Sequence, residues 1–353
     1  MPGRAALAPL QPEIAGPEVV VPENTALREA LDNVFTEPAK APFRWVKAVV
    51  VVKDGRIVAE RYAPGINIGT RLPGYSASKS IINALVGILV RRGKLHIDAP
   101  APVAAWRSSD DPRHRITLDN LLRITSGLAI AQTGSGFDLA SPMLYTERDM
   151  AGYAEAARLE STPGTNVSYS DASTVIVSRI IRDAVGGTGQ DVQRFAQTEL
   201  FAPLGMQGVV MEADATGTPV GSTFILAAAR DWARFGLLLV NDGVIAGKRI
   251  LPEGWVQYSA RSTLGTSYAA GFWTNRTSEP FALRRVRAGM PCDAFFASGN
   301  LGQRVYVMPS SKLVIVRLGI TQQFPDFDIV ADIRLIREVL AAYNIQPPDV
   351  CPN

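Results

Sequence analysis

The chain of 353 residues has very few of the residues that two common kinds of hydrolase site require. Its histidines are His96 and His114, and its cysteines are Cys292 and Cys351. A Ser-His-Asp hydrolase needs a histidine base, and a zinc site needs clustered histidines or cysteines. His96 lies in a turn after a predicted helix and His114 in a polar loop, so we interpret both as surface residues. The sequence therefore argues against both kinds of site and implies no metal or other cofactor.

Long apolar runs and blocks of like charge are also missing. No stretch approaches the ~18 apolar residues of a membrane span, and residues 1–21 lack the continuous apolar core of a signal peptide. The net charge is +3, without a basic block of the kind that binds nucleic acid. We expect no membrane span and no nucleic-acid partner. Compartment, cytoplasmic or periplasmic, and oligomeric state stay open.

Two further features have two interpretations each. Cys292 and Cys351 either pair as a disulfide, which would suggest an oxidising compartment, or are two buried thiols. The densest basic run contains Arg284, Arg285 and Arg287. We interpret this run as a solvated strand face, with a patch for an anionic substrate as the alternative.

Lysine is scarce as well, since 7 of the 36 Lys and Arg residues are Lys and 29 are Arg. Ser76 and Lys79 form the one Ser-x-x-Lys of the chain, at the start of a strongly apolar segment. Residues three apart share a helix face, so the hydroxyl and the amine can meet. Burial disfavours a charged lysine, and a neutral amine beside a hydroxyl is a base beside a nucleophile. The alternative is a polar helix start with Ser76 or Ser78 as N-cap.

Periodicity and turn signals give the order of elements. Helices are predicted over residues 24–35, 77–92, 117–122, 149–159, 171–185, 227–240 and 327–343. Strands are predicted over 45–52 and 56–62, with a primed turn at Asp54-Gly55, and over 268–273, 303–308 and 312–318. Strands near both ends with helices between them predict an α+β fold. In it, an antiparallel sheet flanked by N- and C-terminal helices (residues 1–96 and 226–353) receives an inserted all-helical domain (residues 97–225).

Two further segments carry candidate chemistry. Tyr169 lies on a turn before a helix, where a phenol close to a lysine cation could pass a proton to a leaving group. The alternative is a tyrosine that packs a domain seam. The segment 297–303 is a Gly-rich strand edge, which a substrate can approach closely. If this edge faces Ser76, the backbone N–H groups of Ser76 and Gln303 form an oxyanion hole; otherwise it is a simple turn.

In order, these three segments resemble the Ser-x-x-Lys, Tyr-x-Asn and Lys-Thr-Gly motifs of the serine β-lactamase and penicillin-binding-protein superfamily. The resemblance is closer to its class C branch, which includes serine esterases and 6-aminohexanoate-dimer hydrolases. Segments 116–128, 163–165, 229–236 and 250–255 agree with that branch. The resemblance implies a β-lactamase/transpeptidase-like fold with Ser76, Lys79 and Tyr169 as catalytic residues.

The chain departs from this pattern at two positions. Asp171 stands where class C proteins have Asn, and Asn300 stands where the superfamily usually has Lys or His. A lysine at the latter position resembles the carboxylate clamp of β-lactam enzymes, so its absence favours esters or amides as substrates. We expect the substrate to contact a set of residues around Ser76, namely Tyr145, Asp171, Trp273, Asn300 and Gly302.

The predicted function is hydrolysis of a small ester or amide through an acyl-enzyme. Alternatives are a β-lactamase or D-Ala-D-Ala peptidase-like activity and a non-catalytic binding homologue. An α/β-hydrolase is disfavoured because the segment Gly74–Ser78 lacks the last glycine of Gly-x-Ser-x-Gly and no histidine follows His114.

Overall fold

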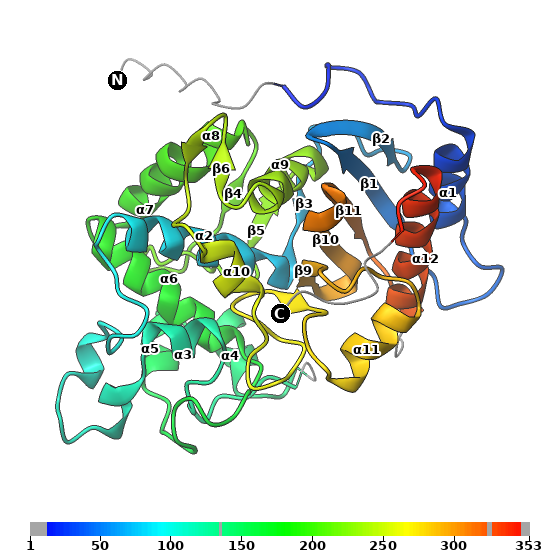
Figure 1. The fold of residues 1–353 in the computed structure, drawn as a ribbon. Helices are drawn as coiled ribbons and strands as arrows, with labels where there is room; N and C mark the ends of the chain where they lie inside the picture. Colours follow the sequence, from blue (N-terminus) through cyan, green and yellow to red (C-terminus); the bar gives the residue numbers. More distant parts are fainter. Residues whose placement is uncertain (1–12, 134–135, 323–326, 347–353) are drawn as a thin grey trace, which may run out of the picture.

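The computed structural model describes residues 13–133, 136–322 and 327–346, and its centre is a six-stranded antiparallel sheet (Figure 1). The strand order is β2-β1-β11-β10-β9-β8. The strands are β1 (Val46–Lys53), β2 (Arg56–Tyr62), β8 (Trp273–Thr274), β9 (Phe295–Gly299), β10 (Gln303–Met308) and β11 (Leu313–Gly319). Short strands form two further sheets: β3 (Leu72–Pro73), β5 (Ile225–Ala227) and β4 (Val210–Met211) in one, β6 (Val244–Ile245) and β7 (Lys248–Arg249) in the other.

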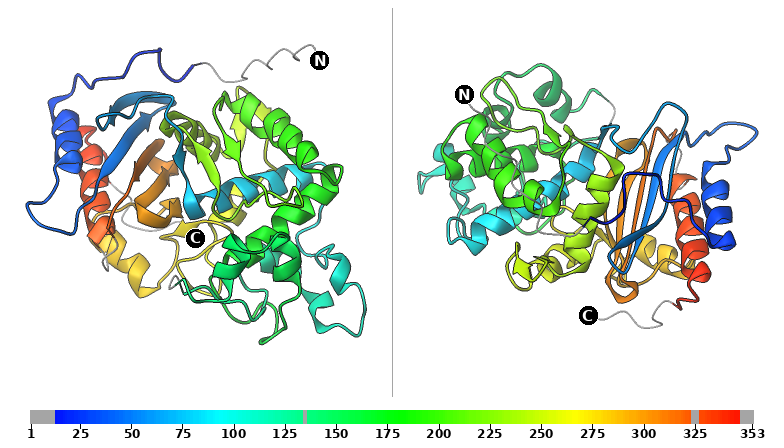
Figure 2. Two further views of the ribbon diagram at one scale, coloured as in Figure 1. Left: turned by 180° about the vertical axis from the view of Figure 1, so that it is seen from behind. Right: turned by 90° about the horizontal axis from the view of Figure 1, so that it is seen from above.

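Helices cover both faces of the large sheet, and Figure 2 shows this sheet edge-on between a thin helical layer and a larger helical region. The thin layer consists of the terminal helices α1 (Thr25–Phe35) and α12 (Phe327–Ala342). The remaining helices are α2 (Ser78–Arg91), α3 (Leu118–Leu122), α4 (Ala140–Tyr145), α5 (Met150–Glu155), α6 (Asp171–Val185), α7 (Gly189–Ala196), α8 (Ala202–Leu204), α9 (Ala229–Val240), α10 (Trp255–Ala260) and α11 (Pro280–Arg287). This arrangement is the predicted α+β class.

The run of valines in β1 is explained by these two layers. Val50 and Val52 belong to the core shared with α2 and α9, whereas Val49 and Val51 belong to the core under α1 and α12. A strand that is buried on both faces is apolar at every position instead of alternating. The sheet is therefore a rigid wall between two apolar cores, and its strand ends can hold a site in place.

Local signals in the sequence place most elements correctly. Asp54 and Gly55 both have positive φ, 49° and 83°, as the primed hairpin turn requires. Asn24 caps α1 by accepting a hydrogen bond from the Leu27 amide. Gly93, with φ 65°, ends the apolar helix α2 in the left-handed conformation.

Two predictions about the later part of the chain are wrong. A strand over residues 268–273 is not formed, because Gly271 at φ 75° turns the chain back and only Trp273 enters the sheet, in β8. The Arg284 to Arg287 run lies on a helix, α11, instead of a strand. Pro280 starts that helix, and the Glu279 carboxylate caps it by accepting hydrogen bonds from the Phe281 and Ala282 amides.

Three other expectations are not tested or are tested in part. Cys292 is buried, but Cys351 lies outside the described residues, so their pairing stays a prediction. The domain boundaries at residues 96–97 and 225–226 also stay a prediction. Within the described ranges, no helix combines the length and the apolar character needed to cross a bilayer.

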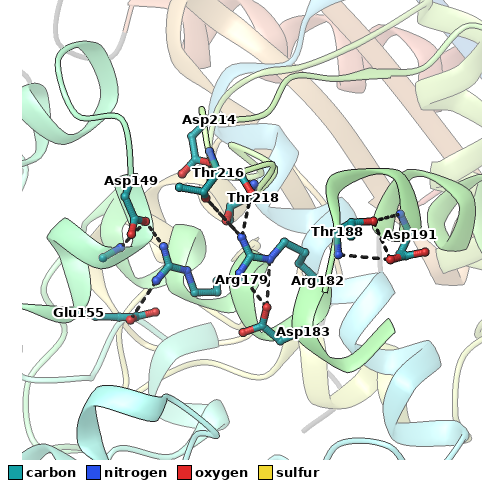
Figure 3. Close-up of polar contacts among 11 residues, drawn as sticks. Asp149, Glu155, Arg179, Arg182, Asp183, Thr188, Asp191, Asp214, Thr216 and Thr218 are labelled. Carbon is teal, nitrogen blue, oxygen red and sulfur yellow. Dashed lines mark hydrogen bonds and ion pairs between the residues drawn. The ribbon is translucent and has the colours of Figure 1, made fainter. Parts of the chain in front are cut away.

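A polar network fastens α6 to its neighbours (Figure 3). Arg179 forms ion pairs with Asp149 at the start of α5 and with Glu155 at its end. Arg182 donates hydrogen bonds to Asp183 and to Thr218 of the loop between β4 and β5. Because α6 begins at Asp171, this network also holds the position of that carboxylate.

Glu155 makes the stability of this network depend on pH. Burial raises the pKa of Glu155 from 4.5 to about 7, Asp183 adds to the rise, and Arg182 opposes it; the contact with Arg179 at 3.3 Å opposes it too. Because the pKa of Glu155 is higher in the folded protein, Glu155 stabilises the fold fully below pH 4.5, and this stabilisation is lost as the pH rises through about 7.

Glu155→Gln should therefore reduce the loss of stability between pH 5 and pH 8. Urea unfolding at both pH values measures this, with the exposed Glu147→Gln as the control; an unchanged pH dependence in Glu155→Gln would contradict the assignment.

Candidate active site

Ser76 lies on a short 3₁₀ turn, η1 (Tyr75–Ala77), that leads into α2. Tyr75 has φ 45°, a backbone conformation that is strained for a non-glycine residue and is typical of functional sites. The turn is fixed to β5 by a hydrogen bond from the Gly74 amide to the Ile225 carbonyl, 2.8 Å. Ser76 is half-buried and lines a cavity of about 760 Å³.

Lys79 reaches Ser76 from the first turn of α2, as the sequence predicts. Its Nζ donates a hydrogen bond to Ser76 Oγ at 3.3 Å and another to the Ser222 carbonyl at 3.0 Å. A third bond goes to Asp171 Oδ1, with which it forms an ion pair. The side chains of Lys79 and Asp171 are 2% and 3% exposed, so the pair is almost entirely removed from water.

The predicted neutral lysine is wrong. Burial lowers the pKa of Lys79, but the Asp171 carboxylate more than reverses this effect and Tyr169 acts in the same direction, so the pKa lies above its usual value. The geometry agrees, because an ammonium group has three donors and no acceptor, and Nζ has three oxygen acceptors around it. The family resemblance places residue 171 close to the lysine, but a neutral Asn at that position would not hold the charge on the amine as the Asp171 carboxylate does.

Asp171 is itself held by Gln132, a residue that the sequence analysis missed. Gln132 Nε2 donates to Asp171 Oδ2 and Gln132 Oε1 accepts from the Asp171 amide, both at 2.9 Å. Asp171 is also the first residue of the 15-residue helix α6, where the helix dipole favours a negative charge. Gln132 lies in the segment 128–142, which has no periodicity, so nothing in the pattern could identify it.

Tyr169 lies beside this pair. Lys79 Nζ is 5.1 Å from the centre of the Tyr169 ring. The ring stacks on Trp273 at 6.3 Å and meets Tyr268 edge to face at 5.9 Å. Both Tyr169 and Trp273 line the cavity, so the predicted chemical role and the alternative of a packing role are compatible.

The end of β9 comes very close to the serine turn. A Cβ atom on Gly299 would lie 2.1 Å from the Gly74 carbonyl oxygen, so only glycine fits at this position. The next residues, Asn300 and Gly302 of η5 (Asn300–Gly302), line the cavity. Gln303 does not: it is 1% exposed, and its side-chain amide bonds to the Asn300 and Gly319 carbonyls.

The structure thus brings together most of the predicted site. All five predicted substrate-contact residues line the same cavity as Ser76 and Tyr169, namely Tyr145, Asp171, Trp273, Asn300 and Gly302. Lys79 lies beneath it. Gln303, predicted as a backbone donor of the oxyanion hole, is the exception, because it pairs with Gly299 in the β9–β10 ladder and does not line the cavity. Gln132, Thr223 and Arg304 also line the cavity and were not predicted.

A buried lysine that donates a hydrogen bond to a serine hydroxyl places a proton-transfer group beside a candidate nucleophile. The chain belongs to the beta-lactamase family, whose profile, Beta-lactamase, matches residues 46–341. The predicted resemblance is therefore confirmed at the level of the family.

Individual relatives include hydrolases of esters and amides. The chain is 25% identical over 302 residues to the 6-aminohexanoate-dimer hydrolase of Paenarthrobacter ureafaciens, covering 80% of this chain and 73% of that protein. A Bacillus anthracis structure provisionally named a 6-aminohexanoate-dimer hydrolase has a TM-score of 0.73 at 21% identity, over 96% of this chain and 89% of that one. A family VIII carboxylesterase has a TM-score of 0.71 at 17% identity, over 94% and 100%. The similarity of these two structures establishes the fold.

The Lys79–Asp171 pair can be tested through stability. Lys79→Met or Asp171→Leu leaves one buried charge without its partner, and each should lower the free energy of unfolding by about 3–5 kcal/mol. The double variant removes both charges and should cost clearly less than the sum. Urea unfolding at pH 7 of the four proteins gives the coupling, and additive costs would show that the two groups do not form a buried ion pair.

Proposed function

We propose that this protein hydrolyses small carboxylic esters or unstrained amides through an acyl-enzyme on Ser76. The observation that carries the proposal is the hydrogen bond from Lys79 Nζ to Ser76 Oγ, 3.3 Å, on the wall of a cavity that also contains Tyr169. The amide hydrolase and the carboxylesterase among the similar proteins support this substrate class.

Asp171 completes a proton relay in this proposal. As Ser76 Oγ forms a bond to the substrate carbonyl carbon, its proton passes to Lys79 Nζ, and Nζ passes one of its own protons to Asp171 Oδ1. Lys79 keeps its charge throughout, and Asp171 becomes the neutral acid. In a buried site the transfer needs no rearrangement of solvent, because the three groups already form hydrogen bonds.

The negative charge that develops on the carbonyl oxygen needs two donors. The Ser76 amide is one, and we assign the other to the Asn300 amide instead of the Gln303 amide. Asn300 lines the cavity directly after Gly299, which lies against the serine turn, whereas Gln303 lies outside the lining.

Tyr169 is the proton donor to the leaving group. Its phenol gives a proton to the departing oxygen or nitrogen as the bond to the carbonyl carbon breaks, and it recovers a proton from Lys79, which takes back the one held by Asp171. A water molecule then attacks the acyl carbon and gives a proton to Lys79, which passes one of its own to Asp171. As the bond from Ser76 Oγ to the acyl carbon breaks, Tyr169 gives Oγ a proton and recovers one from Lys79, which takes back the proton held by Asp171. This order of steps returns all three side chains to their starting states.

Removing the nucleophile or the lysine should abolish activity. Ser76→Ala and Lys79→Ala should each lower kcat/KM for a short-chain p-nitrophenyl ester at least about 10⁴-fold. The two residues act as one catalytic unit, so the loss of either removes most of the rate enhancement that both provide. A fluorophosphonate probe should add its mass to Ser76 in the native protein, and equally in the exposed-serine control Ser310→Ala. Full activity in either catalytic variant, or no adduct on Ser76, would refute the proposal that Ser76 is the nucleophile of a hydrolase.

A substrate panel separates the alternatives within the family. Short-chain esters and linear amides should be hydrolysed with a higher kcat/KM than β-lactams, since the third motif has Asn300 in place of a cation. A clear preference for β-lactams would favour the β-lactamase alternative.

The relay makes a specific prediction about pH. Asp171→Asn removes the main group that raises the pKa of Lys79, so burial is opposed only by Tyr169, and the lysine must lose its proton before it can act as a base. The acid limb of the kcat/KM profile should therefore move to higher pH. Asp242→Asn, which breaks an exposed ion pair with Arg249, is the control; an unmoved acid limb in Asp171→Asn would exclude the relay.

A further inference from the structure

A second pocket lies between α11 and α12, over the edge of the large sheet, where Figure 1 places these two helices next to each other. Its volume is about 590 Å³. Apolar side chains form most of its wall, namely Trp273, Phe281, Phe296, Ile329, Val330 and Ile333. The family reaction as proposed above uses none of these residues except Trp273.

Arg285 lines this pocket and is buried without an acidic hydrogen-bond partner. It is 8% exposed and packs over the Phe296 ring, 5.4 Å from the ring centre. Nε donates to Asn275 Oδ1 at 2.7 Å and Nη2 to the Thr274 carbonyl at 2.9 Å. Within the described part of the chain, no carboxylate forms an ion pair with it. Burying a guanidinium beside neutral oxygens is costly, and burial lowers the pKa of Arg285 accordingly.

One nitrogen of the Arg285 guanidinium, Nη1, is available to donate hydrogen bonds to a ligand. An arginine has five N–H donors and is always charged. The two hydrogen bonds to Asn275 and Thr274 fix the guanidinium plane, and Nη1 has no hydrogen-bond partner among the described residues. Nη1 therefore presents two N–H groups from a side chain that is already held in place.

The charged residues that line the pocket are all arginines, although Glu279 outside the lining also acts on Arg285 and opposes the effect of burial on its pKa. Arg284, Arg304, Arg334 and Arg337 also line it, and none of its lining residues is acidic. The carboxylates nearby are already engaged: Glu338 bonds to Arg334 at 2.7 Å, and Glu279 caps α11 and accepts from Ser267. The pocket thus has an apolar lining with several positive charges. This combination suits a ligand that has an apolar chain and an anionic end.

This pocket borders the catalytic cavity. Trp273, Ser298 and Arg304 line both. Arg304 also donates a hydrogen bond to the Gly299 carbonyl at 2.8 Å, so it contacts the strand end beside Ser76. The two cavities are therefore neighbours, with these three side chains common to both linings.

We propose that the pocket between α11 and α12 binds the carboxylate end of an aliphatic substrate chain, with Arg285 as the group that receives the carboxylate. The preferred substrates are then esters or amides whose acyl chain ends in a carboxylate, with the methylene groups against Phe281, Phe296 and Ile333. This inference rests on the proposed hydrolysis at Ser76. It assigns to the Arg284–Arg287 run the anionic-substrate role that was the alternative in the sequence.

The test compares two p-nitrophenyl esters that differ at the far end of the acyl chain, the hexanoate and the mono-ester of adipic acid. The wild type should show a higher kcat/KM for the adipate ester. Arg285→Met should lower kcat/KM for that ester about 10- to 100-fold, the value of a hydrogen bond to a charged group, and should change the hexanoate value less than about twofold. Arg287→Met is the matched control, because Arg287 is exposed on the same helix and does not line the pocket.

A second variant keeps the test decisive if Arg285→Met fails to fold. Phe281 is 61% exposed on the pocket wall, and Phe281→Asp puts a negative charge there without disturbing the core. It should lower kcat/KM more for the adipate ester than for the hexanoate, and so reduce the preference for the adipate ester. Free adipate should also raise the Tm of the inactive Ser76→Ala protein, and less so when Phe281→Asp is added.

The outcomes separate the two proposals. If neither ester is hydrolysed but adipate raises the Tm, the pocket is supported and the catalytic proposal fails. If the hexanoate is hydrolysed and the adipate ester is no better, or if its advantage survives in both Arg285→Met and Phe281→Asp, the carboxylate pocket is refuted.

Discussion

The candidate site depends on one buried ion pair. Lys79 and Asp171 are nearly inaccessible to water, and a charge at either position would be very unfavourable without the other. Neighbouring residues hold the two charges together. Asp171 is the first residue of α6, and the Gln132 side chain forms hydrogen bonds with both the carboxylate and the backbone amide of Asp171. The Ser222 carbonyl accepts a hydrogen bond from Lys79 Nζ. The third acceptor around Nζ is Ser76 Oγ, the proposed nucleophile.

Two parts of the molecule must meet for this pair to be useful. The serine turn and α2 stand against the large sheet, whereas Asp171 and Tyr169 come from the helical region. The network of Arg179 and Arg182 fixes α6 within that region, and Gly299 lets β9 approach the serine turn closely. The cavity lies where these surfaces join, so its chemistry depends on contacts between segments that are distant in sequence.

This dependence explains what the sequence could predict. Signals that act locally identified α1, the β1–β2 hairpin, α2 with its end at Gly93, and the Ser-x-x-Lys pair. Properties that depend on a contact between residues far apart in the chain could not be predicted from the sequence pattern. The charge of Lys79 is set by Asp171, 92 positions away, and the Gln132 contact comes from a loop without periodicity. The helix at Arg284–Arg287 is different, because its start signal, the Glu279 cap followed by Pro280, is local and present in the sequence.

The charge of Lys79 is the most direct test of this description. The chain has seven lysines, so selective ¹³C labelling of lysine gives a simple spectrum in which Lys79→Arg identifies the Lys79 signal. We expect its side-chain methylene shifts to be those of an ammonium group at pH 7, and to remain so up to the pH at which an ordinary lysine titrates. A Lys79 side chain that is neutral at pH 7 would contradict the ion pair and the relay built on it.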